Sequence, residues 1–584
     1  MSVIVSCYFS YFTALVFGFT RGTLFGCFFV FLIPFAYILL KRKTNLDRDL
    51  KKNWKVILIG ILIYAIYFIA LYPAIFRFYN GYFVMGGPNW QDTAMHLSII
   101  QSLTQGNFPP QAPYFSGQPL SYYYFSDFHA AIVNTLFGKF FPEILILLNP
   151  FLAMTFYFSV YALSYQLSKR RIFSVIAGIA AVFYGNLEFV NLIKATFTQG
   201  LNYFSLVARN PFNFDQNFMQ MTPMADYFLQ NRPMMVGLSI VVLVVLLLKS
   251  KKIFIAGILA AALIKFQLFG FLISWAFFAS FILIKVIARK VSLGRGLRYF
   301  LLFGSSSLLA VVIFMFPSIG SRSAAQIALD SFIWTPWQKH SLTWFILFTI
   351  GNLNIGFLVL VLLTFLKRIW RDRENVWIFL GALFIFIIPF SMRFTIYEFD
   401  MLKFFYYLAP FICALLAYFC SQAKHKKLSV LMFIIITTFS SLTSANLLVH
   451  SYLNKNAGYS YSDYEAGIWI RGNTPQRSVF ITMPTVHSAT SDIGGRLRVI
   501  SYINWPYSHG FNVGSDNVFS RVEDVTVVYK TGDANKVKLK YKAKYVFYGQ
   551  EEKGQFPTAD KLFGNNKNLK LVYNQDGIKI YMII

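Results

Sequence analysis

The segment "NWQDTAMHLSIIQSLTQGNFPPQAPYFSGQPLSYYYFSDFH" (residues 89–129) combines polar, charged and aromatic side chains between long apolar stretches. It contains Asp92, His96, Asp127 and His129, together with three consecutive tyrosines and four prolines. Such side chains are costly in hydrocarbon, so the segment is expected at a membrane surface, where ordered loops carry function. The apolar sequence on both sides of it decides the fold class.

The composition is that of a helical membrane protein. Of the 584 residues, 57% are hydrophobic and 13% are charged, and the mean hydropathy is +0.54. In a soluble protein about a quarter of the residues would be charged. Apolar runs of about 18 or more residues recur, long enough to cross a hydrocarbon core of ~30 Å, whereas a β-barrel would show short alternating segments. We therefore predict a polytopic α-helical membrane protein.

The positive charge is concentrated in short loops. The formal net charge is +29. Lys and Arg cluster at residues 41–55, 169–171, 249–252, 289–298, 367–373 and 424–427. These clusters occupy every second loop between the apolar runs, which is the pattern of cytoplasmic loops in membrane proteins. The charge therefore reports topology, and nucleic acid is not expected as a partner.

The apolar runs and the basic loops together predict thirteen spans in a cell (inner or plasma) membrane, with the N-terminus inside. The predicted spans are 2–19, 22–40, 55–78, 143–166, 172–192, 233–249, 253–265, 267–287, 299–317, 342–366, 376–392, 403–420 and 428–449. This topology places the loops 79–142, 193–232 and 318–341 and a turn at 393–402 on the outer side. The C-terminal part of the chain also lies outside.

The composition changes near Leu453, which divides the chain into a transmembrane domain (1–450) and a soluble outer α/β domain (451–584). In the second domain, "SDYEAGIWIRGNTP" predicts a helix that is N-capped by Ser462 or Asp463. Runs rich in β-branched and aromatic residues predict strands. These runs are "SVFITM", "LRVISYI", "DVTVVYK", "AKYVFYG", "LKLVYN" and "GIKIYMI".

The first outer segment begins with a predicted helix from Trp90 to Leu103, N-capped by Asn89. Asp92 falls in its first turn, where a carboxylate can simply satisfy free backbone amides and meet the positive end of the dipole. His96 lies four residues later on the same helix face. A carboxylate and an imidazole on one face also suit a catalytic site, and the residues alone leave both interpretations open.

An extended, ordered lip is predicted at residues 107–121, because its four prolines disfavour helix and ladder pairing. The three tyrosines that follow suit either an aromatic belt at the membrane interface or a surface for sugars. An amphipathic helix then runs to Phe137. The candidate substrate-binding residues of this region are Tyr122, Tyr123, Tyr124, Asp127 and His129.

The order "D-x3-H … G-x-FPP-x2-P-x3-G-x2-L-x-YYY" resembles the first outer loop of the GT-C class of membrane glycosyltransferases. It is most similar to the bacterial and archaeal branch that is recognised by its YYY motif. The matching residues are Asp92, His96, Gly106, Phe108, Pro109, Pro110, Pro113, Gly117, Leu120 and Tyr122 to Tyr124. In the C-terminal part, "EAGIWIRGNTP", "GGRLRV" and "KYVFYGQEE" are similar to the outer tail of the same branch.

The resemblance implies a GT-C fold that transfers a sugar from a polyprenyl-phosphate-linked donor to a glycan or protein acceptor, in contact with membrane lipid. It implies that Asp92 is the essential acidic residue, either as general base for the acceptor hydroxyl or as a metal ligand. His96, on the same helix face by its spacing, is the second candidate catalytic residue. The chain lacks the Asp-Glu pair of protein mannosyltransferases and the Trp-Trp-Asp motif of oligosaccharyltransferases, so it departs from those branches.

A phosphate-linked sugar donor also calls for cations. The candidates are Arg232, Lys265, Arg393 and Lys403. An Arg side chain binds two phosphate oxygens with its fork, whereas Lys265 in an apolar run also fits a lysine that snorkels at a helix end. Glu398 and Asp400 in the turn 393–402 suit either an internal ion-pair cluster or, with Asp92, a divalent Mg or Mn site.

The leading hypothesis is therefore an integral-membrane glycosyltransferase of the GT-C type. A transporter or flippase for lipid-linked glycans is the alternative from another class, although transporters place charges at the bilayer midplane and often show inverted repeats. A non-catalytic glycan-assembly protein is the third hypothesis. For this third hypothesis the discriminating observation is whether Asp92, His96 and the basic residues converge on one outward cavity.

Overall fold

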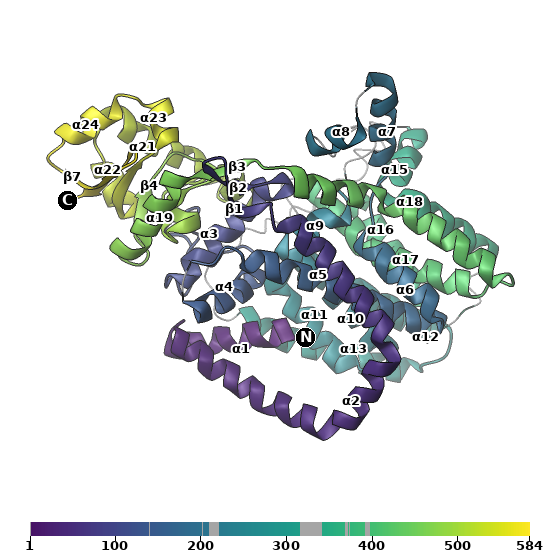
Figure 1. Ribbon diagram of the computed structural model, residues 1–584. Coiled ribbons are helices and arrows are strands. Elements are labelled where there is room, and N and C mark those ends of the chain that lie inside the picture. Colours follow the sequence, from purple (N-terminus) through teal and green to yellow (C-terminus); the bar gives the residue numbers. More distant parts are fainter. Residues whose placement is uncertain are drawn as a thin grey trace.

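The computed structural model describes residues 2–138, 140–200, 202–209, 221–315, 341–367, 372, 374–391 and 398–584. Up to Leu453, the described chain is mainly a bundle of apolar helices packed side by side (Figure 1). These helices are α1 Ser2–Phe17, α2 Arg21–Leu71, α5 Ile144–Ser168, α6 Arg171–Val182, α10 Arg232–Lys249, α11 Ile253–Phe266, α12 Leu268–Ile287, α13 Leu293–Met315, α15 Leu342–Lys367, α16 Val376–Ser391, α17 Lys403–Ser421 and α18 Lys426–Leu453.

Eight helical stretches in the described chain are long and apolar enough to cross a membrane, and five shorter apolar helices lie among them. Helices suit hydrocarbon because each satisfies its own backbone hydrogen bonds. The predicted polytopic helical class is confirmed, while the number of thirteen spans stays a prediction.

The second and third predicted spans differ most from the structure. α2 is one helix of 51 residues that continues through the basic segment 41–55, which the charge pattern predicts to be a loop. This segment contains no Gly or Pro and is rich in Lys, Arg and Leu, all good helix formers. The helix ends at Leu71 rather than 78, because the chain then turns into strand β1, Ile75–Tyr79.

The predicted span 172–192 is also too long. α6 ends at Val182, and the chain from Tyr184 to Leu187 turns before a separate helix, α7 Glu188–Gln199, begins. With α8, Tyr203–Arg209, this helix forms the projection at the top of Figure 1, which packs against α18: the Tyr203 hydroxyl donates to Oδ1 of Asn446 at 2.6 Å.

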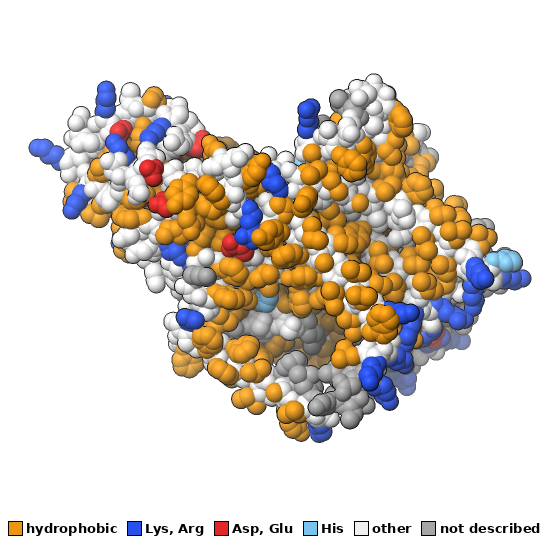
Figure 2. All heavy atoms as spheres, viewed as in Figure 1, with side chains coloured by type: hydrophobic (Ala, Val, Ile, Leu, Met, Phe, Trp, Pro, Cys, Tyr) orange, Lys and Arg blue, Asp and Glu red, His pale blue; other side chains and the backbone are white. Residues whose placement is uncertain are grey.

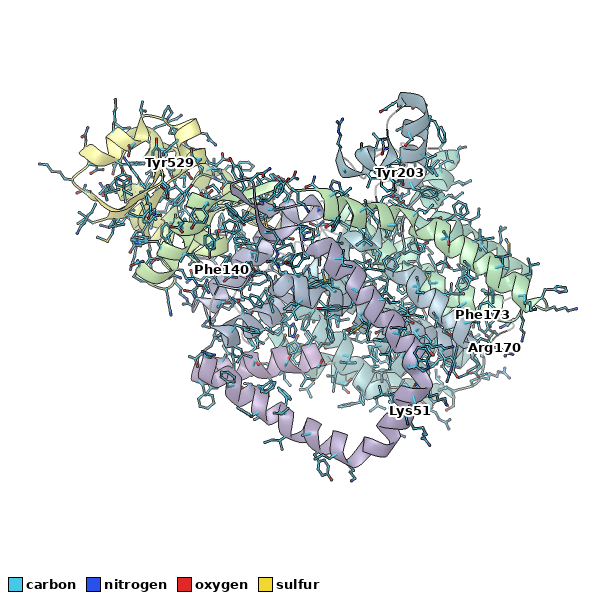
Figure 3. All side chains as sticks on the ribbon, viewed as in Figure 1. Lys51, Phe140, Arg170, Phe173, Tyr203 and Tyr529 are labelled. Carbon is cyan, nitrogen blue, oxygen red and sulfur yellow. The ribbon has the colours of Figure 1, made fainter. Side chains whose placement is uncertain are left out.

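The basic loops gather at one end of the bundle. Figure 2 shows Lys and Arg side chains concentrated at the lower right, and Figure 3 places Lys51 and Arg170 there. The Arg171 side chain donates to the backbone oxygen of Lys52 at 3.3 Å, which joins the first two clusters. Tyr529 of the C-terminal part lies at the opposite end in Figure 3. The two ends thus separate as the charge pattern predicts, and which end faces the cytoplasm stays a prediction.

At that opposite end, segments from distant parts of the sequence meet. A small antiparallel sheet joins β1, β2 (Tyr82–Met85) and β3 (Ala457–Ser460), with Tyr82 opposite Ser460. The first outer segment and the C-terminal part are therefore tied together by a strand pair just beyond the predicted boundary at Leu453. The short elements beside this sheet are η1 Gly87–Trp90, α3 Asp92–Thr104, α4 Phe125–Phe137, α9 Met224–Gln230 and η4 Glu398–Leu402.

The C-terminal part forms a five-stranded mixed sheet of order β5-β4-β6-β8-β7, in which β4 is parallel to β5 and β6 and β8 is antiparallel to its neighbours. The α/β character predicted for this part is confirmed. Its strands and helices are α19 Tyr461–Asn473, β4 Val479–Ile481, β5 Leu497–Arg498, α20 Asn504–Ser508, α21 Val518–Thr531, α22 Asn535–Tyr541, β6 Ala543–Tyr548, α23 Gln550–Gln555, α24 Ala559–Asn565, β7 Leu569–Gln575 and β8 Ile578–Ile583.

Two local predictions in this part are wrong. The run "DVTVVYK" lies in helix α21 instead of a strand, because Asn517 and Ser520 form a capping box at its start and Gly532 ends it in the left-handed conformation. Helix α19 is capped by Ser460, whose side chain and that of Asp463 form a capping box, and not by Ser462 or Asp463 as predicted.

Candidate active site

Asp92 is the first residue of α3 and is partly exposed. The expected cap by Asn89 is wrong, because Asn89 belongs to the separate 3-10 turn η1 and its side chain accepts a hydrogen bond from the Thr93 hydroxyl at 2.9 Å. Gln91 occupies the N-cap position without a side-chain cap bond. Asp92 therefore begins the helix without a side-chain cap, and the charges of His96, Lys403 and Asp400 act on its carboxyl group.

Burial raises the pKa of the Asp92 carboxyl above its ordinary value, while the charges of His96 and Lys403 lower it and that of Asp400 raises it. A helix N-terminus by itself favours the charged form, so the direction of the shift is opposite to the one that position predicts. Desolvation is the larger effect because few water molecules reach a half-buried carboxyl. Lys403 is itself paired with Asp400, with Nζ to Oδ1 at 2.8 Å.

Asp226 is a further carboxylate that the sequence analysis did not single out. It lies in the short helix α9, where the Thr222 hydroxyl donates to one of its oxygens at 2.9 Å and the Gln230 amide donates to the other at 2.8 Å. Burial, with a smaller contribution from the charge of Asp92, raises the pKa of Asp226 to about 6, although the two hydrogen bonds lower it. The second outer loop therefore contributes a carboxylate beside Asp92. Pro223, which starts the helix, was the available sequence signal.

One helical turn after Asp92, His96 begins a row of buried polar side chains that interact with one another. The Nδ1 atom of His96 lies 2.8 Å from Oδ2 of Asp127, and the other carboxylate oxygen lies 3.5 Å from Nε of Arg232. The side chains of His96, Asp127 and Arg232 are 1%, 0% and 1% exposed. Nδ1 of His96 faces the carboxylate, and its Nε2 atom is buried without a hydrogen-bond partner in the described part of the chain.

The guanidinium of Arg232 forms hydrogen bonds with other parts of the protein. Its Nε and Nη2 atoms donate to the backbone oxygen of Ser126 at 3.3 and 2.9 Å, and Nη1 donates to the side chain of Asn149. These bonds tie the start of α10 to α4, so the structure uses the guanidinium as an anchor rather than leaving its fork open for phosphate. His129 lies beside it, half-buried, and burial together with the Arg232 charge lowers its pKa to about 3.

The three consecutive tyrosines separate. The ring of Tyr122 lies 6.1 Å from that of His96, and burial raises its pKa, to which the charges of Asp92 and Asp127 add. Burial and the Asp400 charge raise the pKa of Tyr123 to about 12.

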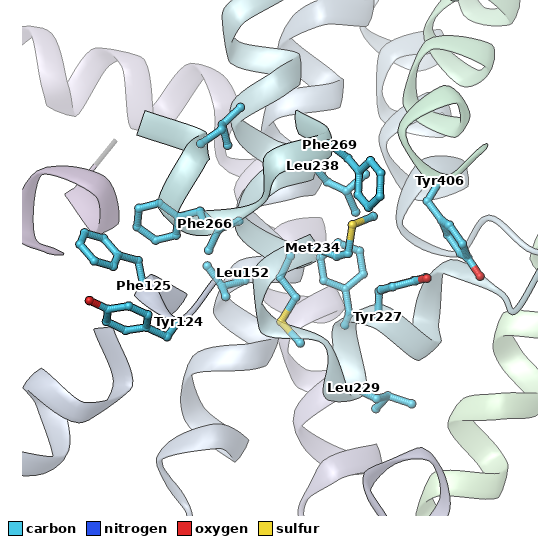
Figure 4. Close-up of a cluster of buried hydrophobic side chains, with 14 of the residues drawn as sticks. Tyr124, Phe125, Leu152, Tyr227, Leu229, Met234, Leu238, Phe266, Phe269 and Tyr406 are labelled. Carbon is cyan, nitrogen blue, oxygen red and sulfur yellow. The ribbon is translucent and has the colours of Figure 1, made fainter. Parts of the chain in front are cut away.

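Tyr124 instead belongs to the hydrophobic core. It is 2% exposed and packs against Phe125, which contacts Phe266 in the cluster of Figure 4. The charges of the candidate site therefore act on Tyr122 and Tyr123, whereas Tyr124 is part of the hydrophobic core.

Three further candidate residues are not brought to Asp92 in the part of the chain that the structure describes. Lys265 is buried in the last turn of α11, next to Phe266, and is not among the charges that act on Asp92. Arg393 and the side chain of Glu398 lie outside the described residues. Among the side chains that the structure describes, no group of three His, Cys, Asp or Glu comes together to hold a metal ion. Because the set of Asp92, Glu398 and Asp400 includes a side chain that the structure does not describe, the divalent metal site stays a prediction.

The C-terminal part contributes a residue that the sequence did not indicate. His509 follows α20, and its Nδ1 atom lies 2.8 Å from the Tyr114 hydroxyl. Its ring centroid is 4.5 Å from that of Tyr122. Because His509 and Tyr114 are 395 positions apart, the sequence pattern held no signal for this contact.

The predicted lip 107–121 is the surface on which the C-terminal part rests. The Ser116 N–H donates to the Arg498 oxygen at 3.0 Å, and the Arg498 N–H donates to the Pro113 oxygen at 2.9 Å. The Arg521 side chain donates to the Ser116 oxygen at 2.8 Å. Extended backbone in a proline-rich lip has free N–H and C=O groups, and here the C-terminal part uses them.

Comparison with protein families gives one match. The family described as "Uncharacterized membrane protein (DUF2298)" matches residues 5–210, a range that includes the whole first outer segment. The resemblance recognised in that segment, to the branch with the YYY motif, is thereby confirmed. A search of the curated proteins gives no match.

Several solved structures are similar to the chain. The oligosaccharyltransferase of Archaeoglobus fulgidus in the apo form has 14% identity and a TM-score of 0.43, over 91% of this chain and 74% of its own. The same enzyme, AglB, in complex with an inhibitory peptide and a dolichol-phosphate has 15% identity and a TM-score of 0.38 over the same shares. ArnT from Cupriavidus metallidurans bound to undecaprenyl phosphate has 11% identity and a TM-score of 0.48, over 91% of this chain and 98% of its own.

Proposed function

We propose that this protein is a glycosyltransferase that moves a sugar from a polyprenyl-phosphate-linked donor to an acceptor at the outer face of the cell membrane. The observation that carries the proposal is the convergence of Asp92 with Lys403 and Asp400, which come from outer segments far apart in the sequence and act on one another electrostatically. The resemblance of the first outer segment to GT-C glycosyltransferases supports the same reaction.

Asp92 is the general base in this proposal. It accepts the proton of the acceptor hydroxyl as the acceptor oxygen bonds to the anomeric carbon and the bond from that carbon to the phosphate oxygen breaks. The electron pair of the broken bond leaves with the phosphate. A carboxylate whose pKa is raised by burial is a stronger base than an exposed one, and general-base catalysis works best when the pKa approaches the ambient pH.

Lys403 is the cation for the departing phosphate. Its charge acts on Asp92, and its side chain keeps 20% exposure, so a phosphate can reach it. An ammonium is a compact point charge with three N–H donors, which suits a terminal phosphate. In the free protein its positive charge is balanced by Asp400 at 2.8 Å.

His96 and Asp127 support the base. The Asp127 carboxylate holds Nδ1 of the imidazole, so that Nε2 is the ring nitrogen left for a substrate, as in the oriented histidines of catalytic triads. In this arrangement Nε2 of His96 forms a hydrogen bond with a substrate hydroxyl while Asp92 takes the proton.

One observation favours testing the transporter alternative in parallel. α15 is interrupted at Asn354, which has φ 64° and whose side chain donates to the Gly185 oxygen at 2.9 Å. Interrupted spans occur in transporters of small solutes. The test must therefore follow both the bond to the sugar and the leaflet of the lipid.

The experiment uses the full-length protein in liposomes that contain undecaprenyl-phosphate-linked radiolabelled hexoses. Acceptor glycans come from membranes of cells that lack the protein. Transfer of label from the lipid fraction to the acceptor fraction is the expected result. Label that only changes leaflet would establish the transporter hypothesis, and label that neither moves nor transfers would leave the assembly hypothesis.

A further inference from the structure

His509 is held in place by two tyrosines of the first outer segment. Its Nδ1 atom lies 2.8 Å from the hydroxyl of Tyr114, a side chain that is 1% exposed. Its ring lies over Tyr122, with centroids 4.5 Å apart and planes inclined by 35°. A hydrogen bond and a ring contact together fix both the position and the rotation of the imidazole.

His509 is a neutral group in the midst of charges. Burial lowers its pKa to about 3, with Lys403 and His96 adding to the shift and Asp400 opposing it. The charges of the same three residues also act on Asp92, with which His96 shares helix α3. A neutral imidazole cannot balance a phosphate charge, so it contributes hydrogen bonds and an aromatic face.

The contact with Tyr114 also sets which nitrogen carries the proton. A phenol hydroxyl is a far stronger proton donor than a neutral imidazole N–H, so Tyr114 donates to Nδ1. The proton of the imidazole then lies on Nε2. The atom of His509 that remains for a ligand is therefore an N–H donor, and its natural partner is a hydroxyl or ring oxygen.

We propose that His509 binds the sugar of the lipid-linked donor, with its Nε2–H donating to a sugar oxygen while Lys403 holds the adjoining phosphate. This inference rests on the proposed function. In such a donor the phosphate and the sugar are directly bonded. In the protein Tyr122 connects His509 to the helix of Asp92, because its ring centroid lies 4.5 Å from that of His509 and 6.1 Å from that of His96. Tyr122 beside the imidazole extends the aromatic surface, which suits the apolar face of a sugar. The C-terminal part thus supplies a substrate-binding residue.

The test measures binding to the full-length protein in lipid nanodiscs with two kinds of probe. One is undecaprenyl phosphate, and the other is undecaprenyl phosphate linked to glucose, mannose or galactose. The variant His509→Phe keeps an aromatic ring but has no N–H donor. It is expected to bind the preferred hexose probe about tenfold more weakly, and undecaprenyl phosphate with unchanged affinity.

Two further variants separate binding from structure. His509→Gln offers an amide N–H near the position of Nε2 and should keep affinity for the hexose probe within about threefold of the wild type. Tyr114→Phe keeps both rings but removes the hydroxyl that fixes the proton, so it should weaken the hexose probe selectively as well. His425→Gln, at an exposed position, is the matched control.

The inference is overturned if His509→Phe weakens both probes equally, which would indicate a structural role, or if it weakens neither. Transfer of label by the wild-type protein in the same preparations reports on the proposed function separately. A wild type that binds hexose probes no better than undecaprenyl phosphate overturns the role of His509 even where transfer is detected. Absence of transfer together with selective binding of the hexose probe would contradict the proposed transferase function and support the sugar-binding role of His509.

Discussion

Nδ1 of His96 and Oδ2 of Asp127 are 2.8 Å apart, and both side chains are shielded from water. The pair joins α3 to α4, the two helices that flank the lip of the first outer segment. Arg232 approaches the second oxygen of the carboxylate from α10, at 3.5 Å. The first outer segment therefore contains a buried row of interacting side chains, formed by His96, Asp127 and Arg232. Asp92 lies one helical turn before His96 in α3.

Replacement of Asp127 by Asn should affect both stability and activity. The variant leaves the buried Arg232 without its carboxylate, and breaking a buried pair typically costs about 3–5 kcal/mol. The midpoint of thermal unfolding in detergent should fall clearly, and any transfer activity should fall because His96 is no longer held by a carboxylate. Asp576→Asn, at an exposed turn, is the control. Equal midpoints for the two variants would show that the buried chain does not stabilise the protein.

Arg521 should control the docking of the C-terminal part on the lip. Its guanidinium donates to the Ser116 oxygen at 2.8 Å and lies 3.5 Å from the centroid of the Phe115 ring. Arg521→Met removes both interactions, so amide hydrogen exchange at residues 113–118 should accelerate at least roughly tenfold. Lys544→Met, on an exposed face of β6, should leave exchange there unchanged. Unchanged exchange in Arg521→Met would mean that other contacts hold the lip.

The predicted sidedness can be read by cysteine labelling in intact cells. Ser515 and Lys426 are exposed and lie at opposite ends of the molecule, beyond α20 and at the start of α18. The four native cysteines give little background because three are buried and Cys420 is partly buried. An impermeant maleimide should label Ser515→Cys and should label Lys426→Cys only after lysis. Labelling of both from outside would contradict the topology.

Asp226 should make stability depend on pH. Burial raises its pKa from the ordinary 3.8 to about 6, so the folded protein holds this proton more tightly than the unfolded chain does. Stability contributed by the protonated form is full below about pH 4 and is lost as the pH rises through about 6. Asp226→Asn should therefore raise the unfolding midpoint at pH 7.5 and change it little at pH 4.5. A gain of equal size at both values would show that ionisation is not the cause.

The helical membrane class follows from the sequence, because hydrocarbon leaves few alternatives to long apolar helices. Element boundaries depend on finer balances. The polar segment 41–55 is made of helix formers, so α2 continues through it. In α21, the cap at Asn517 and the burial of Val525 and Val528 on one helix face outweigh the strand preference of β-branched residues.

The site shows the same division. Asp92 and His96 share one helix, so a spacing of four residues predicts that they meet. Asp226 and His509 reach the same region through the packing of separate segments, which local sequence does not encode. Arg232 also illustrates the limit, because an arginine at a span boundary fits a phosphate ligand until the structure shows its donors bonded to Ser126 and Asn149.

The most direct test compares Asp92→Asn with the wild type in the transfer of hexose from undecaprenyl-phosphate-linked hexose to acceptor glycans. The substituted amide would keep the shape of the carboxylate but cannot act as a base, and general-base catalysis is typically worth about 10²–10⁴-fold. We predict a loss of initial rate in that range, with the affinity for the lipid-linked hexose within about threefold of the wild type and with an unchanged unfolding midpoint. Transfer by Asp92→Asn at a rate close to that of the wild type would contradict the assignment of Asp92 as the base and, with it, the proposed mechanism.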